Sequence, residues 1–385
     1  MKIHGVKLEN FMLFDKLDAE FSPNVNIICG ENSTGKTALI KLLYSCAKDV
    51  SVLCTLYKPS EDTTGKQDIQ NHVMGIKHEL PFPTRIQSVF GLNDALEVHG
   101  LIRLPNCSRA HIATHFILND EANFTKQLDL FESEYGFSIQ ETPDSKFPRL
   151  SKSTNANVIY IPPKEMISAT ENFTSLYEEY HISFDETYYD LARLLDRPRK
   201  KTLSPEMEKV AQSMEALIGG KVRQKGKAFY LDMDGVGELR MSLVSEGYRK
   251  LATLLNLVST GSLSDGAILF WDEPETNMNP RMVEPLVKAI LALAGAGVQV
   301  FVTTHDYFVQ QYFGLAAEYG ERFQAGTGNL EYRFLSLNKA RTADGAETVT
   351  LESASRLLEL EHNAVKEEFD AVYNKEVGLI YGDNA

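Results

Sequence analysis

Apolar and polar positions alternate along the first part of the chain, and this alternation predicts β-strands. Apolar side chains recur at strand spacing over Ile3–Phe11 and again over Leu17–Phe21. The mostly apolar run Val25–Cys29 stops at Gly30, which is typical of a buried strand. Over Ala38–Tyr44 the apolar residues recur at helical spacing. The pattern therefore predicts a strand, a glycine-containing loop and a helix, in that order.

The middle of the chain gives shorter signals. An exposed loop is predicted over Pro59–Asp68, and a buried strand over Asn157–Ile161 that two prolines end. Two more strands are predicted over Ala110–Leu118 and Phe137–Gln140, and two helices over Tyr188–Leu195 and Pro205–Ile218. An antiparallel hairpin or meander is predicted over Lys221–Leu231 and Gly237–Leu243.

The final third alternates between helices and strands, which favours a parallel sheet. The helices are predicted over Tyr248–Leu257 and Pro280–Leu293, and the strands over Ala267–Trp271 and Val298–Thr303. Beyond them the pattern predicts a β-like stretch over Leu330–Leu337 and an acidic amphipathic helix over Leu351–Tyr373. That helix either packs on its own core or docks a partner.

Composition narrows the class of protein. A chain of 385 residues predicts two lobes or one large α/β domain with an insertion. The net charge of −14 repels phosphate backbones on average, so nucleic acid would need a local basic patch. The four cysteines show no disulfide or zinc spacing, which indicates free thiols in a reducing compartment. The longest mostly apolar stretch, Ala289–Val302, is too short to span a bilayer, so we expect a cytoplasmic protein without a membrane partner.

The loop between the first buried strand and the first helix matches the pattern G-x-x-x-x-G-K-[ST]. Its eight residues are Gly30, Glu31, Asn32, Ser33, Thr34, Gly35, Lys36 and Thr37. Glycines let backbone N–H groups close around a phosphate, and the start of the helix adds its positive dipole end. Lys36 would neutralise the β- and γ-phosphates, and the Thr37 hydroxyl would ligate Mg²⁺. This loop predicts an ATP site.

Two carboxylates follow the strand predicted over Ala267–Trp271. Ligands bind at the carboxyl ends of strands in open α/β sheets, so Asp272 and Glu273 are expected at that edge. Asp272 would hold a water bound to Mg²⁺, and Glu273 would orient or deprotonate the attacking water. The next strand ends in Thr303-Thr304-His305, which brings His305 within reach of the γ-phosphate.

A polar turn opens the helix predicted over Tyr248–Leu257. Ser245 is suited to cap that helix, or Ser245 and the Gly247 N–H bind a γ-phosphate. One subunit does not need two helix N-termini on one nucleotide. The second reading therefore implies a dimer with nucleotide between the subunits.

These motifs, in this order, resemble those of ABC-type ATPases of the RecF/SMC/OLD-like branch. The resemblance rests on Gly30–Thr37, Ser245-Glu246-Gly247, Asp272-Glu273 with the turn Pro274–Asn277, and His305. It implies an α/β P-loop NTPase with an ABC-type ATPase head, an antiparallel β subdomain and a helical insertion. It also implies a homodimer, or a larger even-numbered oligomer, that closes on ATP and Mg²⁺. The expected parts are an N-terminal part of the lobe over 1–164, an insertion over 165–240, a C-terminal part over 241–306 and an extension over 307–385.

The chain departs from the family pattern in two motifs. The glutamine expected after the strand Asn157–Ile161 is absent, with Glu165 as a substitute and Gln87 as a weaker alternative. Glu246 stands where glycine is common, which brings a carboxylate near a phosphate. The sequence also contains neither long coiled-coil arms nor, after His305, room for a nuclease domain. We therefore expect any nuclease or toxin to be a separate effector protein.

Three functions are compatible with these features. The first is an ATPase that senses or regulates a separate effector in prokaryotic anti-phage defence, a reading that rests on family analogy. The second is a RecF-like repair ATPase that binds DNA directly through the basic residues of Lys221–Lys227. The third is a nucleotide-held scaffold that sequesters a toxin.

Overall fold

The computed structural model describes residues 1–56, 82–92, 97–103, 107–119, 122–133, 136–141, 147–148, 157–180, 182–324, 326, 328–342 and 345–381. The loop predicted over Pro59–Asp68 lies outside them. All four cysteines are free thiols, as expected.

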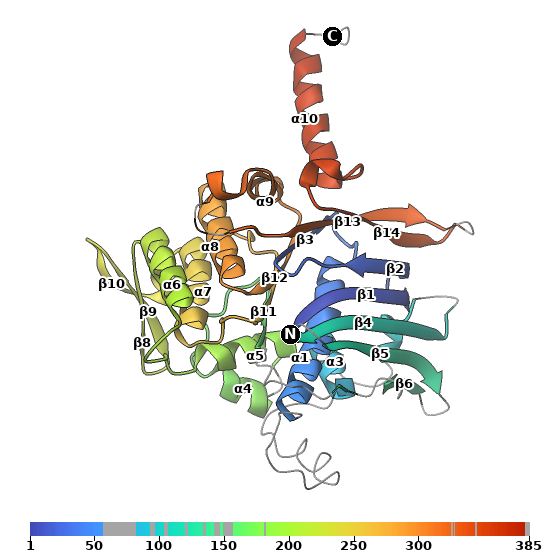
Figure 1. Ribbon diagram of the computed structural model, residues 1–385, viewed down its shortest axis with the longest axis horizontal. Coiled ribbons are helices and arrows are strands. Elements are labelled where there is room, and N and C mark those ends of the chain that lie inside the picture. Colours follow the sequence, from blue (N-terminus) through green and yellow to red (C-terminus); the bar gives the residue numbers. More distant parts are fainter. Residues whose placement is uncertain are drawn as a thin grey trace.

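A six-stranded sheet forms the centre of the fold (Figure 1). Its strands, in spatial order, are β14 (Glu347–Ala354), β13 (Tyr332–Arg341), β3 (Val25–Gly30), β12 (Gln299–Thr304), β11 (Ile268–Asp272) and β7 (Val158–Ile161). Only β14 is antiparallel to its neighbour. The four strands from β3 to β7 are buried along their whole length, as their apolar runs predict. Because these four strands are parallel, β3, β12, β11 and β7 end at one edge of the sheet.

The alternating N-terminal segments form a second, antiparallel sheet. Its strands, in spatial order, are β2 (Phe14–Glu20), β1 (Lys2–Phe11), β4 (Arg109–Asn119), β5 (Ala122–Ser133) and β6 (Gly136–Glu141). Helix α1 (Lys36–Leu56) follows β3, and its apolar side chains share one core with this sheet and with one face of the central sheet. Helix α3 (Phe82–Phe90) packs beside α1. The expected antiparallel β subdomain is therefore present.

Helices cover the other face of the central sheet, where a second apolar core lies. They are α4 (Phe173–Tyr180), α5 (Glu186–Leu195), α6 (Pro205–Ile218), α7 (Glu246–Ser259), α8 (Val283–Gly295) and α9 (Tyr307–Tyr319). The predicted hairpin or meander is a meander of three strands, β8 (Gly220–Lys225), β9 (Ala228–Met233) and β10 (Gly237–Arg240). Within the described residues no helix is both long and apolar enough to cross a membrane.

The end of the chain differs from the prediction. The helix expected over Leu351–Tyr373 is confirmed only for its last part, because residues up to Ala354 belong to β14 and helix α10 covers Ala364–Tyr381. The β-branched residues Thr348–Thr350 favour a strand, and this local preference outweighs the helical spacing of the leucines that follow. The segment 307–385, which we expected as an extension, also supplies β13 beside β3 in the central sheet. The other domain boundaries stay a prediction.

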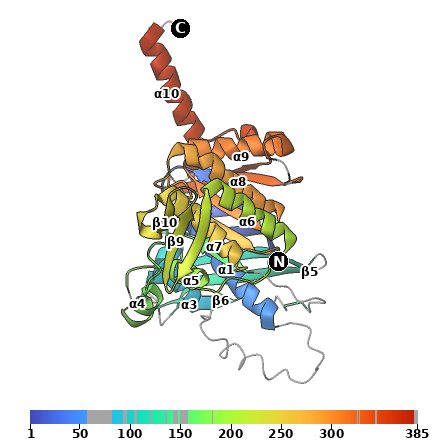
Figure 2. The same cartoon turned by 90° about the vertical axis from the view of Figure 1, so that its left-hand side faces the viewer.

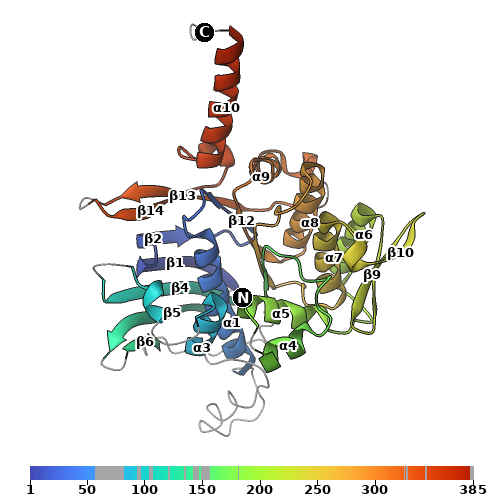
Figure 3. The same ribbon diagram turned by 180° about the vertical axis from the view of Figure 1, so that it is seen from behind.

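Helix α10 projects away from the rest of the molecule in all three views (Figures 1, 2 and 3). Its attachment includes the ring of Phe369, which stacks on Tyr307 at the start of α9 with 4.1 Å between centroids. Further along α10 the apolar side chains Val372, Leu379 and Ile380 are exposed.

Candidate functional site

The loop Gly30–Thr37, called the cradle loop below, has the tight backbone that its glycines predict. Gly35 has φ +87°, and a Cβ there would lie 2.8 Å from the Phe14 ring. Gly30 has φ +147° and lies against the carbonyl of Leu337 on β13. Ser33 also has a positive φ, +64°, which is strained for a residue with a side chain. Neighbouring strands thus fix the path of the loop, and α1 begins at Lys36 at its end.

The ammonium group of Lys36 is folded back into the cradle loop. Its Nζ donates to the carbonyl oxygens of Gly30 (2.8 Å) and Glu31 (2.7 Å). Burial lowers the pKa of Lys36, while the nearby carboxylates of Glu273 and Asp272 oppose that shift. The structure therefore brings the predicted lysine and the two predicted carboxylates into one electrostatic neighbourhood.

Asp272 is buried at the end of β11 and accepts hydrogen bonds from three hydroxyl groups. Thr37 Oγ1 (3.1 Å) and Thr303 Oγ1 (2.5 Å) both donate to Oδ1, and the Tyr160 hydroxyl donates to Oδ2 at 3.0 Å. Burial raises the pKa of Asp272, and the hydroxyl donors act in the opposite direction. Thr37 and Asp272, both predicted at the Mg²⁺ site, are thus in direct contact.

Sequence reasoning missed Tyr160 and Thr303. Both stand near the ends of buried strands that flank β11, and Thr303 is directly opposite Asp272 in the register. A polar residue near the end of an adjacent parallel strand is the signal that would have identified them.

Glu273 and His305 lie side by side at the same edge. His305 Nδ1 is 3.1 Å from Glu273 Oε1. The backbone of Glu273 has φ +45°, and its N–H is held by the carbonyl (3.2 Å) and hydroxyl (3.0 Å) of Thr303. Strain of this kind directs a side chain that ordinary strand geometry would send elsewhere. The structure therefore pairs the two residues that we predicted as catalytic.

A serine lies at the N-terminus of α7. Ser245 is the exposed N-cap residue, but its side chain forms no capping hydrogen bond. Gly247 is buried against Met278 and Met282. Among the hydrogen bonds of the described residues, none joins Ser245 or Gly247 to the cradle loop of the same chain. Their role in binding phosphate stays a prediction.

The two candidates for the missing glutamine lie in different surroundings. Glu165 pairs with Arg249 on α7 at 2.9 Å and accepts a hydrogen bond from the Ser168 hydroxyl. Gln87 lies on α3, and its carbonyl accepts the N–H of Leu92 at 2.8 Å. Glu165 is therefore already engaged with α7, and Tyr160 on β7 is the side chain from this region that contacts Asp272.

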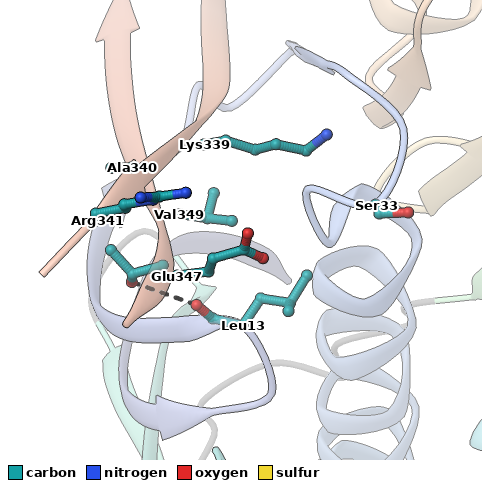
Figure 4. Close-up of a pocket in the computed structure, with 8 residues that line it drawn as sticks. Leu13, Ser33, Lys339, Ala340, Arg341, Glu347 and Val349 are labelled. Carbon is teal, nitrogen blue, oxygen red and sulfur yellow. Dashed lines mark hydrogen bonds between the residues drawn. The ribbon is translucent and has the colours of Figure 1, made fainter. Parts of the chain in front are cut away.

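Two cavities flank the cradle loop. One of about 360 Å³ is lined by Met12, Leu13, Asn32–Ala38, Lys41, Phe90 and Glu273. The other, of about 630 Å³, lies between Leu13, Ser33 and the β13–β14 hairpin (Figure 4). In that view the Lys339 side chain extends from β13 toward the loop, and a hydrogen bond from Thr348 to the Leu13 carbonyl closes the opposite side. The first cavity contains the predicted phosphate-binding residues.

Comparisons with known proteins concern the family and the fold of the chain. Residues 111–309 match the family described as "AAA domain, putative AbiEii toxin, Type IV TA system", and residues 6–51 match a second family described as "AAA domain". The chain is also similar to "DNA replication and repair protein RecF" of Halalkalibacterium halodurans, with 47% identity over 47 residues, 12% of this chain and 13% of that protein. The RecF of Listeria monocytogenes serovar 1/2a is 34% identical over 86 residues, 22% of this chain and 20% of that protein. The chain thus spans a fifth or less of the length of these relatives.

A solved structure has a related fold. The SMC head bound to the C-terminal winged-helix domain of ScpA superimposes with a TM-score of 0.51 at 12% identity, covering 94% of this chain and 100% of that one. The first family match alone covers just over half of the 385 residues. The chain therefore belongs to the family described as "AAA domain, putative AbiEii toxin, Type IV TA system", and it has the fold of an ABC-type ATPase head.

Proposed function

We propose that this protein binds ATP with Mg²⁺ and hydrolyses it as a dimer that closes around the nucleotide. The observation that carries the proposal is the hydrogen bond from Thr37 to Asp272 beside the buried Lys36. This hydrogen bond holds the cradle loop beside the carboxyl end of β11. Phosphoryl transfer needs a phosphate-binding loop and metal-binding carboxylates close to each other.

The residues present are suited to the ligands. A narrow loop at the start of α1 offers N–H groups and the Lys36 ammonium to a triphosphate. The Thr37 hydroxyl and the Asp272 carboxylate are the oxygen donors that Mg²⁺ prefers. No cluster of three or more His, Cys, Asp or Glu side chains forms a metal site in the described part of the chain. Mg²⁺ in such sites takes one or two protein ligands together with phosphates and waters, so the two-residue donor set fits.

In this proposal each side chain has a separate task. Thr37 and Asp272 hold Mg²⁺, which neutralises charge on the phosphate oxygens when bound. Lys36 exchanges the carbonyls of Gly30 and Glu31 for phosphate oxygens. Glu273 orients the attacking water and accepts its proton, and His305 keeps the Glu273 carboxylate in place by hydrogen bonding to it.

The position of α7 supports the proposed dimer. Ser245 is exposed, has no capping hydrogen bond, and is not bonded to the cradle loop of its own chain. A hydroxyl at a helix N-terminus is suited to bind phosphate. We therefore assign Ser245 and Gly247 to the nucleotide in the cradle loop of a second subunit.

Phosphate release from ATP tests the proposed activity. The purified protein is expected to release phosphate only with Mg²⁺ present, and Glu273→Gln is expected to lower kcat by at least about a hundredfold while ATP still binds. Glu284→Gln is the matched control, because Glu284 lies on α8 in an exposed pair with Lys288. Full activity in Glu273→Gln would overturn the assignment of the catalytic base.

The output of the ATPase is assigned to a separate effector protein, as part of prokaryotic anti-phage defence. The family description names a putative toxin of a Type IV toxin–antitoxin system, and the two-component nature of such a system supports a second protein that acts with this chain. Purification from the native host with mass spectrometry is expected to recover a partner whose release depends on ATP. A protein that purifies alone in both nucleotide states would contradict this assignment.

The similarity to RecF supports direct DNA binding as a second candidate function. The basic strand β8 is partly neutralised, since Arg223 pairs with Asp232 at 2.9 Å and Lys225 with Glu238 at 2.6 Å. DNA binding would appear as stimulation of ATP hydrolysis with a steep salt dependence. Loss of both effects in Lys221→Ala/Lys227→Ala would favour this candidate over the effector model.

A further inference from the structure

We infer that Lys250 is a positioning residue that joins the start of α7 to the turn Pro274–Asn277. It thereby fixes the position of Ser245 relative to Glu273. The inference rests on the proposed function, because it concerns how that site is assembled. Its basis is a buried lysine outside the cradle loop whose hydrogen bonds go to backbone carbonyls.

The contacts of Lys250 are unusual for a lysine. Its side chain is 2% exposed, and its Nζ donates to the carbonyl oxygens of Pro274 (3.0 Å) and Thr276 (2.6 Å). Its carboxylate partner, Glu246, is more distant, with 4.0 Å between Nζ and Oε1. The ammonium group therefore acts as a clamp on the backbone of the turn.

Burial of this ammonium group carries a desolvation cost, which argues against a packing role. Burial lowers the pKa of Lys250, and the surrounding carboxylates of Glu246, Glu275, Glu165 and Glu273 oppose the shift. An apolar side chain of similar volume would fill the same space without the desolvation penalty. What the lysine adds is hydrogen bonds to the carbonyl groups of Pro274 and Thr276.

Hydrogen bonds within the turn connect Lys250 to Glu273. The carbonyl oxygen of Glu273 accepts hydrogen bonds from the N–H (3.1 Å) and the hydroxyl (2.9 Å) of Thr276. Thr276 is the residue whose own carbonyl binds Lys250. Glu273, which precedes the turn, and Asn277, its last residue, both have a positive φ. At Glu273 this conformation is strained and needs support from its surroundings.

The same helix presents the serine assigned to the second nucleotide. Lys250 lies little more than one helical turn after Ser245, and Asn277 adds an exposed contact to Glu246 at 3.5 Å. In the proposed dimer, Glu273 serves the nucleotide of its own chain and Ser245 serves that of the other. Lys250 therefore ties together residues that act on two different nucleotides.

Lys250→Met tests the inference, because methionine fills the volume without donating hydrogen bonds. We expect the affinity for ATP, measured by calorimetry, to stay within about twofold, since the cradle loop is untouched. We expect kcat to fall at least about tenfold, because small displacements of a catalytic group are costly to rate. Lys288→Met, at a half-exposed ion pair with Glu284 on α8, is the matched control and should retain both values.

Asn277→Gly provides a second test that leaves the core intact. Glycine keeps the positive φ of +58° but removes the side chain that contacts Glu246. A fall of kcat of about twofold to fivefold with unchanged ATP affinity would support the inference, since this link is exposed and weaker. This variant decides the matter if Lys250→Met does not fold.

The outcomes separate this inference from the proposed function. A kcat within twofold of wild type in both variants would overturn the role of Lys250 and leave the proposed function intact. A kcat that falls only in parallel with ATP affinity would also overturn it, because a general loss of structure explains that pattern. Failure of the wild-type protein to bind or hydrolyse ATP would overturn the proposed function itself.

Discussion

The Thr37 hydroxyl donates a hydrogen bond to Asp272 across 3.1 Å, although 235 positions separate the two residues in the sequence. Thr37 is the second residue of α1, and Asp272 is the last residue of β11. Their contact is possible because β3 and β11 are parallel and flank β12, so both strands deliver their last residues to one edge. Each of the following predictions concerns a group near this contact or in the adjoining polar core.

Removing the cradle lysine should remove nucleotide binding. Lys36→Ala deletes the buried cation that we assign to the phosphates, and charged hydrogen bonds are the strong ones. We expect ATP affinity to fall at least about a hundredfold, which corresponds to about 2.7 kcal/mol. Calorimetric titration with ATP measures the change. Lys7→Ala, at an exposed pair on β1, is the control, and normal affinity in Lys36→Ala would contradict the site.

Blocking the proposed base should trap the closed dimer. Glu273→Gln preserves the size of the side chain but cannot accept the proton of water. We expect an ATP-dependent dimer on size-exclusion chromatography that reverts slowly to monomer after ATP is removed. Wild-type protein under turnover provides the comparison. A variant that binds ATP and stays monomeric would count against the shared site.

Asp272→Asn should stabilise the protein while abolishing its activity. Because burial raises the pKa of Asp272, holding that carboxylate ionised in the fold destabilises the native state at neutral pH. A neutral amide relieves this penalty, so we expect the free energy of unfolding to rise by about 0.5 to 2 kcal/mol without nucleotide. Urea denaturation at pH 5 and pH 8 measures it, with the larger gain expected at pH 8. A destabilised variant would show that the three hydroxyl donors outweigh the desolvation.

The free energy of unfolding should depend on pH through Glu186, a buried carboxyl group on α5. Burial beside Asp190 raises the pKa of Glu186 from 4.5 to about 7, while Tyr177, Arg85 and Lys48 act in the opposite direction. The folded chain therefore holds a proton that the unfolded chain releases between those two values, and stability falls as pH rises through that window. Glu186→Gln should remove this loss and stabilise the protein at pH 8 by about 1 to 3 kcal/mol.

Urea denaturation from pH 4.5 to pH 8 measures this difference. The two proteins should be similar in stability at the lower limit and diverge up to about pH 7. Glu284→Gln, at an exposed site, should follow the wild-type curve. A constant difference across the range would mean that Glu186 does not titrate in this window.

Strong local patterns made much of this fold predictable. The runs Val25–Cys29 and Val298–Thr303 identify buried parallel strands because they are apolar and bounded by breakers or polar ends. Residues at the ends of such strands are brought together by the sheet itself, which is why the sequence pattern alone identifies Asp272, Glu273 and His305 as neighbours. Their roles with nucleotide stay predictions until the variants above are measured.

Other contacts depend on tertiary structure that no local pattern carries. Lys250 looks like an ordinary helical lysine in the sequence, and only the fold shows that it is buried against the turn Pro274–Asn277. The first residues of the helix predicted over Leu351–Tyr373 form a strand for a similar reason, since pairing with β13 decides their state. Pairing partners distant in sequence override a weak local preference.

The position of β13 has a consequence for synthesis of the protein. The motifs for nucleotide are all translated by His305, but β3 then still lacks its neighbour on one side, and Gly30 lacks the Leu337 carbonyl that it lies against. A nascent chain at that length presents an open strand edge, which favours pairing with other chains. Residues up to Leu337 must therefore be synthesised before the proposed nucleotide site has all its neighbours, and we expect ATP to bind only after β13 has paired with β3.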